Sequence, residues 1–508
     1  MTGGESYWIA STEDSNYVAL QGDVDVDVAV VGGGITGLTA ALLLQEAGAS
    51  VVVLEAASSL GKGVTGATTG KITAGQGTVY SELEERHGPK AAAAYAASQS
   101  AAVELVAALV DAHGIECDLE RVTHFVFAER SDEMSRLQGE GEAARRAGLQ
   151  VELLPDPPVP FPAVAALGLP DQLQFHARKY LLGLARAVVQ AGGVIHQQAR
   201  VEEIEGGEPR RIRLPGGTVT AREIVLATHV PFGLRGGFYA RLEARAAYAV
   251  AAPVGEETLE GAWINVGTPT RSLRTTPLRD GGRLLVVVGE GHVVGREGDP
   301  ETRYDALANY VELHLTDEDI AYRWSTQDQY PVDGLPYIGR VGRGTDGVYV
   351  ATGFAGWGLS NGTLAGMLIA DAIAGRENEW AWLYDPTRSS ARRAPGSLVK
   401  QNLAVAKELV RGKLRSRAGS LESVAAGAGD VIELDGEKVA VYRSPEGRLT
   451  AVSAACTHMG CDVAWNSAES TWDCPCHGSR FAVSGAVLEG PAVTPLDPVE
   501  LESPTPSL

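Results

Sequence analysis

The sequence has few cysteines for its length, no excess of basic residues and no long apolar run. Only 5 of its 508 residues are cysteine, which argues against a disulfide framework. It has 43 Lys and Arg against 64 Asp and Glu, a net charge of -21, so a polyanion such as nucleic acid is not expected as its main partner. No stretch approaches the ~20 apolar residues that span a bilayer, and the N-terminus lacks the pattern of a signal peptide. We therefore expect a cytoplasmic protein without a transmembrane segment.

Glycine, in contrast, is frequent and clustered. The chain has 61 glycines, well above a usual share of ~7%, and they follow no fixed period, which excludes collagen. A hydrophobic content of 44% supplies several cores, and the length predicts about three domains. The glycine clusters indicate that the backbone closely approaches a bound molecule.

The first cluster lies between two apolar runs near the N-terminus. VDVAVV (26–31) meets GGGITG (32–37) and a helical LTAALLLQEAG, and SVVVLEA follows at 50–56. This order predicts a strand, a tight turn, a helix and a second strand, which is the arrangement that binds a dinucleotide. Gly32 permits the turn, Gly34 admits a pyrophosphate, and Gly37 allows close packing. The helix start adds Ile35 and Thr36, and the second strand ends with Glu55 and Ala56, where Glu55 is placed to accept a ribose hydroxyl.

The next segment favours FAD over NAD. In GKGVTGATTGKITAGQG (61–77), small and hydroxyl residues continue where an NAD-dependent dehydrogenase usually begins another plain βα unit. Thr68, Thr69 and Lys71 are candidate cofactor contacts. Lys71 either lies near the flavin or faces solvent.

Residues ~24–385 resemble the FAD-dependent oxidoreductases of the D-amino acid oxidase type, which include the glycine and sarcosine oxidases. The resemblance is carried further by FHARKYLLGLARAVVQAGG (175–193), EIVLATHVPF (223–232), DGLPYIGR (333–340) and GVYVATGFAGWGLSNGTLAGMLIADAIAG (347–375). It implies an α/β FAD-binding domain of Rossmann-like, glutathione-reductase type with an interleaved antiparallel-sheet substrate domain. It also implies further FAD contacts at Val201, Thr228, Gly353, Phe354, Gly356, Trp357 and Gly358.

The same resemblance implies transfer of a hydride from a C–N bond to the flavin. Arg and Tyr side chains hold the substrate in that family, and candidates for such catalytic roles here are Arg274, Tyr248, Tyr337, His176 and Trp357. Each also has an ordinary structural interpretation. Arg271 points away from Arg274 on a strand.

A connector follows at residues 386–420. Its segment SLVKQNLAVAKELVRGKLRSR (397–417) places leucine and valine near helical spacing with Lys and Arg between them, which predicts a basic amphipathic helix. The helix either docks its apolar stripe on the preceding domain or contacts a membrane surface or a partner.

Four of the five cysteines lie in two boxes, CTHMGC (456–461) and CPCHGS (474–479). Two thiols and two imidazoles can hold zinc, but a C-x-H pair is unusual for it, and haem attachment needs C-x-x-C-H. Residues 421–508 closely resemble the all-β Rieske fold, which holds a [2Fe-2S] cluster through one Cys and one His from each box. The resemblance assigns Cys456, His458, Cys474 and His477 as iron ligands.

The Rieske resemblance also implies roles for the neighbours of these ligands. Cys461 and Cys476 match a disulfide pair, although a free thiol pair remains possible in a reducing cell. Ser479 matches a serine that donates a hydrogen bond to the cluster. Phe481 replaces a tyrosine donor, which predicts a lower reduction potential than in respiratory Rieske proteins.

Together the two halves predict a flavoprotein dehydrogenase for an amine or an amino-acid-like small molecule. Electrons would leave singly through the Rieske cluster to an external acceptor, with His458 or His477 exposed as the exit. Reverse flow from an external donor to a reducible substrate is an alternative, as is a non-catalytic electron-transfer or redox-sensing module. A ring-hydroxylating oxygenase is not expected, because the other histidines show no close pair at helical spacing with an acid.

Overall fold

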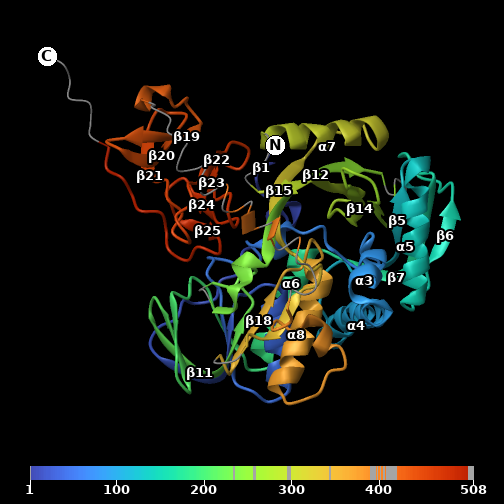
Figure 1. The fold of residues 1–508 in the computed structure, drawn as a ribbon, viewed down its shortest axis with the longest axis horizontal. Coiled ribbons are helices and arrows are strands. Elements are labelled where there is room, and N and C mark those ends of the chain that lie inside the picture. Colours follow the sequence, from blue (N-terminus) through green and yellow to red (C-terminus); the bar gives the residue numbers. More distant parts are fainter. Residues whose placement is uncertain are drawn as a thin grey trace.

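The computed structural model describes residues 2–232, 235–255, 259–294, 299–342, 345–389 and 420–501, together with residues 396, 399, 400, 402, 403, 405 and 407. Figure 1 shows a mostly parallel sheet flanked by helices, a large, mostly antiparallel sheet beside it, and the C-terminal strands on one side of both. The basic helix expected over 397–417 falls mainly outside the described residues.

The mostly parallel sheet has the strand order β17-β18-β11-β2-β3-β8, with β10 paired to β11 and β9 paired to β10. Buried valines fill β2 and β3, as is typical of parallel strands covered on both faces. The strands are β2 (Val24–Val31), β3 (Val51–Leu54), β8 (Val194–His196), β9 (Glu203–Glu205), β10 (Arg210–Leu214), β11 (Gly217–Leu226), β17 (Tyr337–Arg340) and β18 (Val348–Thr352).

Helices α2 (Ile35–Glu46), α6 (Ala177–Gln190) and α8 (Gly358–Ile373) pack beside this sheet. Gly366 lets α8 approach α2, because a Cβ there would lie 2.7 Å from Cβ of Thr39. The remaining helices are α1 (Tyr7–Ala10), α3 (Val79–His87), α4 (Pro89–His113), α5 (Met134–Arg146), α7 (Pro300–His314) and α9 (Ala381–Tyr384), with short 3-10 turns η1 (Val64–Ala67), η2 (Ser131–Glu133), η3 (Arg235–Ala240) and η4 (Leu421–Ser423).

The large sheet is built from three separate parts of the chain, within residues 2–3, 71–174 and 242–331. Its order is β1-β16-β12-β15-β14-β13-β5-β7-β4, with β6 paired to β7. The strands are β1 (Thr2–Gly3), β4 (Lys71–Ile72), β5 (Glu120–Ala128), β6 (Glu152–Pro155), β7 (Ala165–Gln174), β12 (Leu242–Val254), β13 (Ala262–Asn265), β14 (Ser272–Pro277), β15 (Arg283–Val293) and β16 (Tyr322–Pro331). This interleaving confirms the predicted fold class for the first part of the chain.

One helix departs from the expectation that nothing reaches membrane-spanning length. By length and composition α4, with a hydropathy of 1.4, is apolar enough to cross a membrane. Its alanine-rich sequence gives this value, and the side chains of Tyr95, Val103 and Val106 are buried in the core shared with α8. Its composition therefore has a packing explanation.

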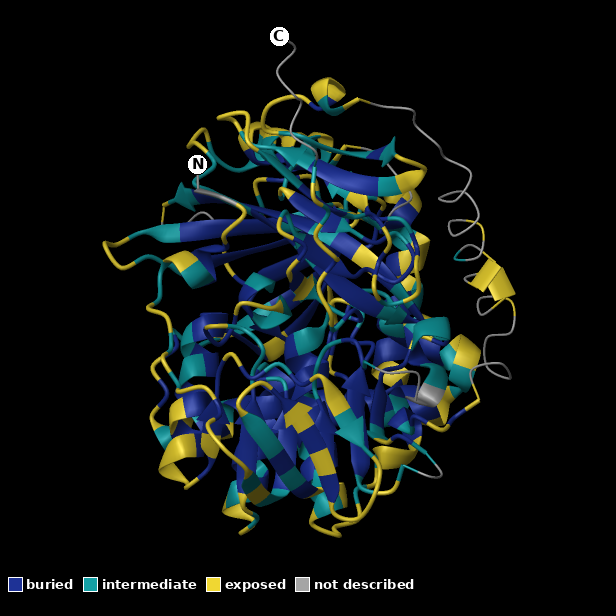
Figure 2. Cartoon of the chain, turned by 90° about the vertical axis from the view of Figure 1, so that its left-hand side faces the viewer, coloured by how far each residue is buried: buried dark blue, intermediate teal, exposed yellow. Residues whose placement is uncertain are grey.

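The C-terminal part is all-β, as predicted. A three-stranded sheet holds β19 (Gly429–Leu434), β20 (Glu437–Arg443) and β21 (Leu449–Ser453), and a four-stranded sheet holds β22 (Ala464–Asn466), β23 (Thr471–Asp473), β24 (Arg480–Ala482) and β25 (Val487–Glu489). Figure 2 shows buried residues in the mostly parallel sheet and in the large sheet, with exposed residues mainly around the outside of the molecule. The two C-terminal sheets carry the loops that hold the cysteine boxes.

Candidate functional site

The glycine turn after β2 is held by contacts that leave no room for side chains. Gly32 has a φ of 110°, and a Cβ there would collide with the carbonyl oxygen of Ala227. A Cβ on Gly37 would collide with the carbonyl oxygen of Gly32, so only glycine lets helix and turn pack this closely. Gly34 caps α2, whose free N–H groups suit a phosphate. Gly33 is also close to a neighbour, because a Cβ there would lie 2.6 Å from Cδ2 of Leu60, a contact with a side chain rather than with the backbone.

Glu55 closes the turn from the end of β3. Its two carboxylate oxygens accept the N–H groups of Gly33 and Ala57, each at 2.8 Å. Burial raises the pKa of this carboxyl, although the two N–H donors act in the opposite direction. Glu55 therefore fixes the turn as well as lining the cavity beside it.

A cavity of about 1610 Å³ begins at this turn. Ordinary small-molecule sites hold roughly 300–1,000 Å³, so the cavity has space for a dinucleotide and a small substrate. The predicted cofactor residues that line it are Gly32, Gly34, Ile35, Thr36, Glu55, Ala56, Thr68, Thr69, Lys71, Val201, Thr228, Phe354, Gly356, Trp357 and Gly358. Gly37 and Gly353 lie behind the lining, where Gly353 packs on Pro331. The residues present fit FAD.

The loop before α8 is held from the large sheet by Asp328 of β16. One carboxylate oxygen accepts the N–H of Gly356, and the other lies 3.1 Å from Nε2 of His229. Burial opposes a charge on His229, but this carboxylate outweighs burial and raises the pKa of its imidazole. No sequence motif marks Asp328 or His229, because the pair forms only when two distant segments meet.

Of the five predicted catalytic residues, the structure places Trp357 in the cavity lining and the other four elsewhere. The guanidinium of Arg274 donates to the carbonyl oxygens of Thr69, Gly70 and Phe175 and so holds the strand of Lys71. The imidazole of His176 caps α6 by accepting the N–H of Lys179.

Tyr248 and Tyr337 also have structural surroundings. Tyr248 stacks on His292, with 5.8 Å between ring centroids. Tyr337 is fully buried, and the guanidinium of Arg388 lies 3.8 Å from its ring centroid. Both tyrosine rings pack against other side chains, and neither residue is in the cavity lining.

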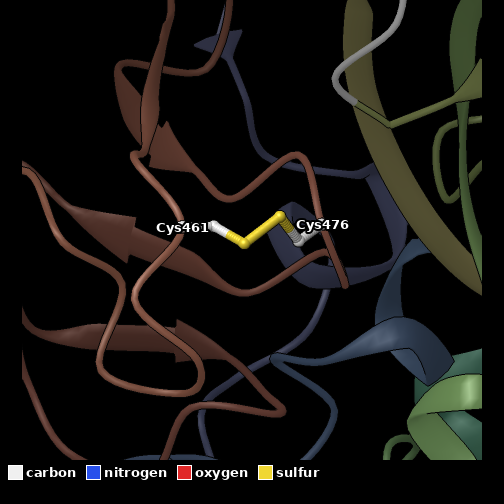
Figure 3. Close-up of a disulfide and its surroundings, with 2 residues drawn as sticks. All are labelled: Cys461 and Cys476. Atoms are coloured by element: carbon white, nitrogen blue, oxygen red, sulfur yellow. A yellow bond between two sulfur atoms is a disulfide. The ribbon is translucent and has the colours of Figure 1, made fainter. Parts of the chain in front are cut away.

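The two cysteine boxes form neighbouring loops in the C-terminal part. Cys456 and His458 follow β21, and Cys474 and His477 lie between β23 and β24. A disulfide joins Cys461 to Cys476 and ties the two loops together (Figure 3). Cys456 and Cys474 are free and buried, and Oγ of Ser479 accepts the N–H of Ala492 at 3.1 Å.

The two histidines present unpaired nitrogens to this site. Nδ1 of His458 and of His477 is buried without a hydrogen-bond partner, and their ring centroids lie 4.9 Å apart. Burial lowers the pKa of His477 to about 4 and also lowers that of His458, which keeps both imidazoles in the neutral form that binds metal. Two thiols and two orphaned Nδ1 atoms fit a Rieske cluster.

The histidine pair faces the first part of the chain. The ring of Tyr239, in η3, lies 5.8 Å from that of His477 and 6.3 Å from that of His458. His477 is only 8% exposed and His458 is half-buried. The expectation of an exposed exit is thus wrong for His477, because the box loops pack on the neighbouring domain.

The cavity and the box loops share one wall, strand β16. Thr326, Asp328 and Tyr330 line the cavity. The intervening Gln327 amide, oriented to satisfy both of its partners, donates to the carbonyl oxygen of Gly478 at 3.0 Å and accepts from Nη2 of Arg480 at 3.2 Å. Neighbouring side chains of one strand therefore contact the two sites, although Ser325, on the same face as Gln327, lines the cavity as well. The sequence alone did not reveal this arrangement.

Comparisons with protein families divide the chain in the same way. A family model described as "FAD dependent oxidoreductase" matches residues 27–372, and a "Rieske [2Fe-2S] domain" matches residues 416–501. These matches confirm FAD and a Rieske [2Fe-2S] cluster as the predicted cofactors.

Individual relatives agree. A Bacillus subtilis (strain 168) protein named YhfW, described as a Rieske 2Fe-2S iron–sulfur protein, is 34% identical over 98% of both chains. The gamma-glutamylputrescine oxidoreductase of Escherichia coli (strain K12) is 26% identical, over 73% of this chain and 89% of its own. The crystal structure of glycine oxidase from Geobacillus kaustophilus superposes with a TM-score of 0.61 at 22% identity, covering 72% of this chain and 99% of its own. The last likeness shows the fold.

Proposed function

Because the chain belongs to the family of FAD-dependent oxidoreductases and carries a C-terminal Rieske [2Fe-2S] domain, we propose that it oxidises a C–N bond of an amine or an amino-acid-like molecule. The electrons then leave one at a time through the Rieske domain to an external acceptor. FAD supplies a two-electron acceptor for hydride, and the cluster supplies a one-electron carrier.

The observation that carries this proposal is the shared wall. Asp328 touches the Gly356 loop on the cavity side of β16, and the adjacent Gln327 touches the loop of His477 on the other side. One backbone unit separates these two contacts, so the residues around both cofactor sites belong to one packed interface. Such packing supports electron exchange within a single chain.

The names of two relatives support an amine or amino-acid substrate. Relatives named glycine oxidase and gamma-glutamylputrescine oxidoreductase act, by their names, on molecules with C–N bonds. Beyond the turn, the cavity continues between Trp357 and Ser272 toward the large sheet. We assign substrate contact to Trp357 and FAD contact to the other predicted cofactor residues that line the cavity, Lys71 excepted. The guanidinium of Arg274 positions Gly70.

The proposed domain limits are 1–385 for the flavoprotein part, 386–420 for the linker and 421–508 for the Rieske domain. The bounds of the two family matches support this division. Within the Rieske part, Cys456, His458, Cys474 and His477 are the proposed ligands, and Ser479 is the proposed hydrogen-bond donor to the cluster.

Anaerobic titration of the purified protein with amines and amino acids tests the proposal. Visible absorption follows the flavin, and electron paramagnetic resonance follows the reduced cluster. We expect a substrate to bleach the flavin first and then produce the cluster signal. Bleaching by a chemical donor only, with turnover of a reducible substrate, would instead establish reverse flow. A flavin that no small molecule reduces or reoxidises would indicate an electron-transfer or sensing module.

A further inference from the structure

A buried lysine stands at the end of the cavity that meets the large sheet. Lys71, the first residue of β4, is 7% exposed and lines the cavity. Its Nζ donates to Oγ of Ser272 and lies 5.4 Å from the ring centroid of Trp357. Among the described residues, no carboxylate lies within ion-pair distance of this ammonium group.

The other groups around Lys71 do not supply the missing negative charge. The guanidinium of Arg274 repels it, and burial together with this repulsion lowers the pKa of Lys71 to about 7. The neighbouring His124 is 1% exposed, and both of its ring nitrogens lack a hydrogen-bond partner. Burial, reinforced by Lys71, holds the pKa of His124 far below its usual range, so this ring is neutral.

A buried cation without a counter-charge is costly unless a ligand provides one. Lys62 offers a contrast, because it lines the same cavity but lies 3.2 Å from the carboxylate of Asp14. Arg274 is a weaker candidate for binding an anion, because its guanidinium donates to backbone carbonyl oxygens and the residue is outside the cavity lining. Arg200 and Arg303 also line the cavity, and they donate to the carbonyl oxygens of Val487 and Glu290. In the contacts of the described residues, the ammonium group of Lys71 has neither a carboxylate nor a carbonyl oxygen as its partner.

Resting on the proposed function, we propose that Lys71 binds the carboxylate of the substrate, with Ser272 and Trp357 beside it. The substrate class is then an amino acid with a free carboxylate, rather than a simple amine. This role replaces the expectation that Lys71 contacts the flavin.

The test compares two probes of the same shape, acetate and acetamide, through their effect on the flavin absorption of the oxidised holoprotein. We expect acetate to bind more tightly than acetamide. Lys71→Met should weaken the affinity for acetate by about tenfold or more, because it removes a charge-assisted hydrogen bond. The affinity for acetamide should stay nearly unchanged. Lys71→Arg should keep part of the preference. Lys90→Met, at an exposed lysine of α4 outside the cavity lining, should keep all of it.

Three results would overturn the proposal. The first is an acetate preference that survives in Lys71→Met, and the second is a wild-type protein whose flavin absorption does not respond to acetate. The third is a Lys71→Met protein that loses FAD or shifts the flavin potential without a probe, because that result would place Lys71 on the flavin. The proposed function fails separately, when no amine or amino acid bleaches the flavin although acetate binds as expected.

Discussion

At the scale of single residues, Lys71 makes the stability of the protein depend on pH. Its pKa is about 7 in the folded chain against an ordinary 10.5, so the unfolded chain binds more protons between these values. The cost of burying the charge is fully present below pH 7 and disappears as the pH rises toward 10.5. Lys71→Met removes this cost, and we expect it to raise the free energy of unfolding at pH 6 by on the order of a few kcal/mol.

The measurement is the thermal midpoint of the wild-type and variant holoproteins from pH 6 to pH 9.5. The variant's advantage should stay nearly constant up to about pH 7 and then shrink as the pH rises to 9.5. Arg274 and His124 are present in both proteins. The variant removes the repulsion between Lys71 and His124, but burial, the larger cause, still lowers the pKa of His124. Lys90→Met, at an exposed lysine of α4, is the control. An advantage that is constant with pH would show that Lys71 is not the titrating group.

Residue identity in the sequence was enough to locate the cofactor sites but not the substrate site. Gly32, Gly34 and the two Cys-x-His-type boxes have fixed spacings along the chain, because each turn is local. Arg274 and Tyr337 were plausible substrate residues, yet their partners, Gly70 and Arg388, are distant in sequence. Only the folded chain shows that these two side chains are already engaged.

At the scale of elements, strand β16 joins the two cofactor sites. Its pattern of alternating side chains predicts a strand but not which domain each face meets. Gln327 is the contact that reaches the Rieske loop, through the carbonyl oxygen of Gly478. A side chain on Gly478 would lie 2.8 Å from Cβ of Ala244, so the loop sits directly against the large sheet. That closeness depends on tertiary packing, which local spacing does not encode.

Gln327→Leu should therefore weaken the coupling of the two halves. The leucine cannot donate to Gly478 or accept from Arg480, and it leaves a buried carbonyl and guanidinium group without this partner. We expect the flavin to bleach at the wild-type rate after mixing with substrate, and the cluster signal to appear several-fold more slowly. Rapid-mixing absorption and freeze-quench resonance measure the two steps.

Gln138→Leu, on the exposed face of α5, serves as the matched control for this experiment. It should change neither step. If Gln327→Leu leaves the delay between flavin and cluster unchanged, the Gly478 contact does not contribute to coupling. If it slows flavin bleaching as well, the substitution has disturbed the cavity through Asp328.

At the scale of the whole molecule, two family domains lie within one chain and pack at one interface. The sequence predicted both domains because each carries its own local signature. It did not predict their docking: Tyr239 against the histidine pair, Gln327 against Gly478, and Arg200 donating to Val487 at 3.1 Å. These contacts join segments more than 100 residues apart.

The docked arrangement makes the Rieske domain the expected route to a large external acceptor. Cys474→Ser removes a proposed iron ligand at a residue that lies outside the cavity lining. We expect this variant to lose the cluster signal, to retain FAD and to bleach with substrate as the wild type does. Its reduction of cytochrome c, a protein too large to enter the cavity, should fall at least tenfold, because the remaining route must start from the buried flavin. Cys117→Ser changes the free buried cysteine of the flavoprotein part. This variant should bleach with substrate and reduce cytochrome c as the wild type does. Cytochrome c reduction at the wild-type rate without the cluster would mean that electrons leave the flavin directly and that the Rieske domain has another role.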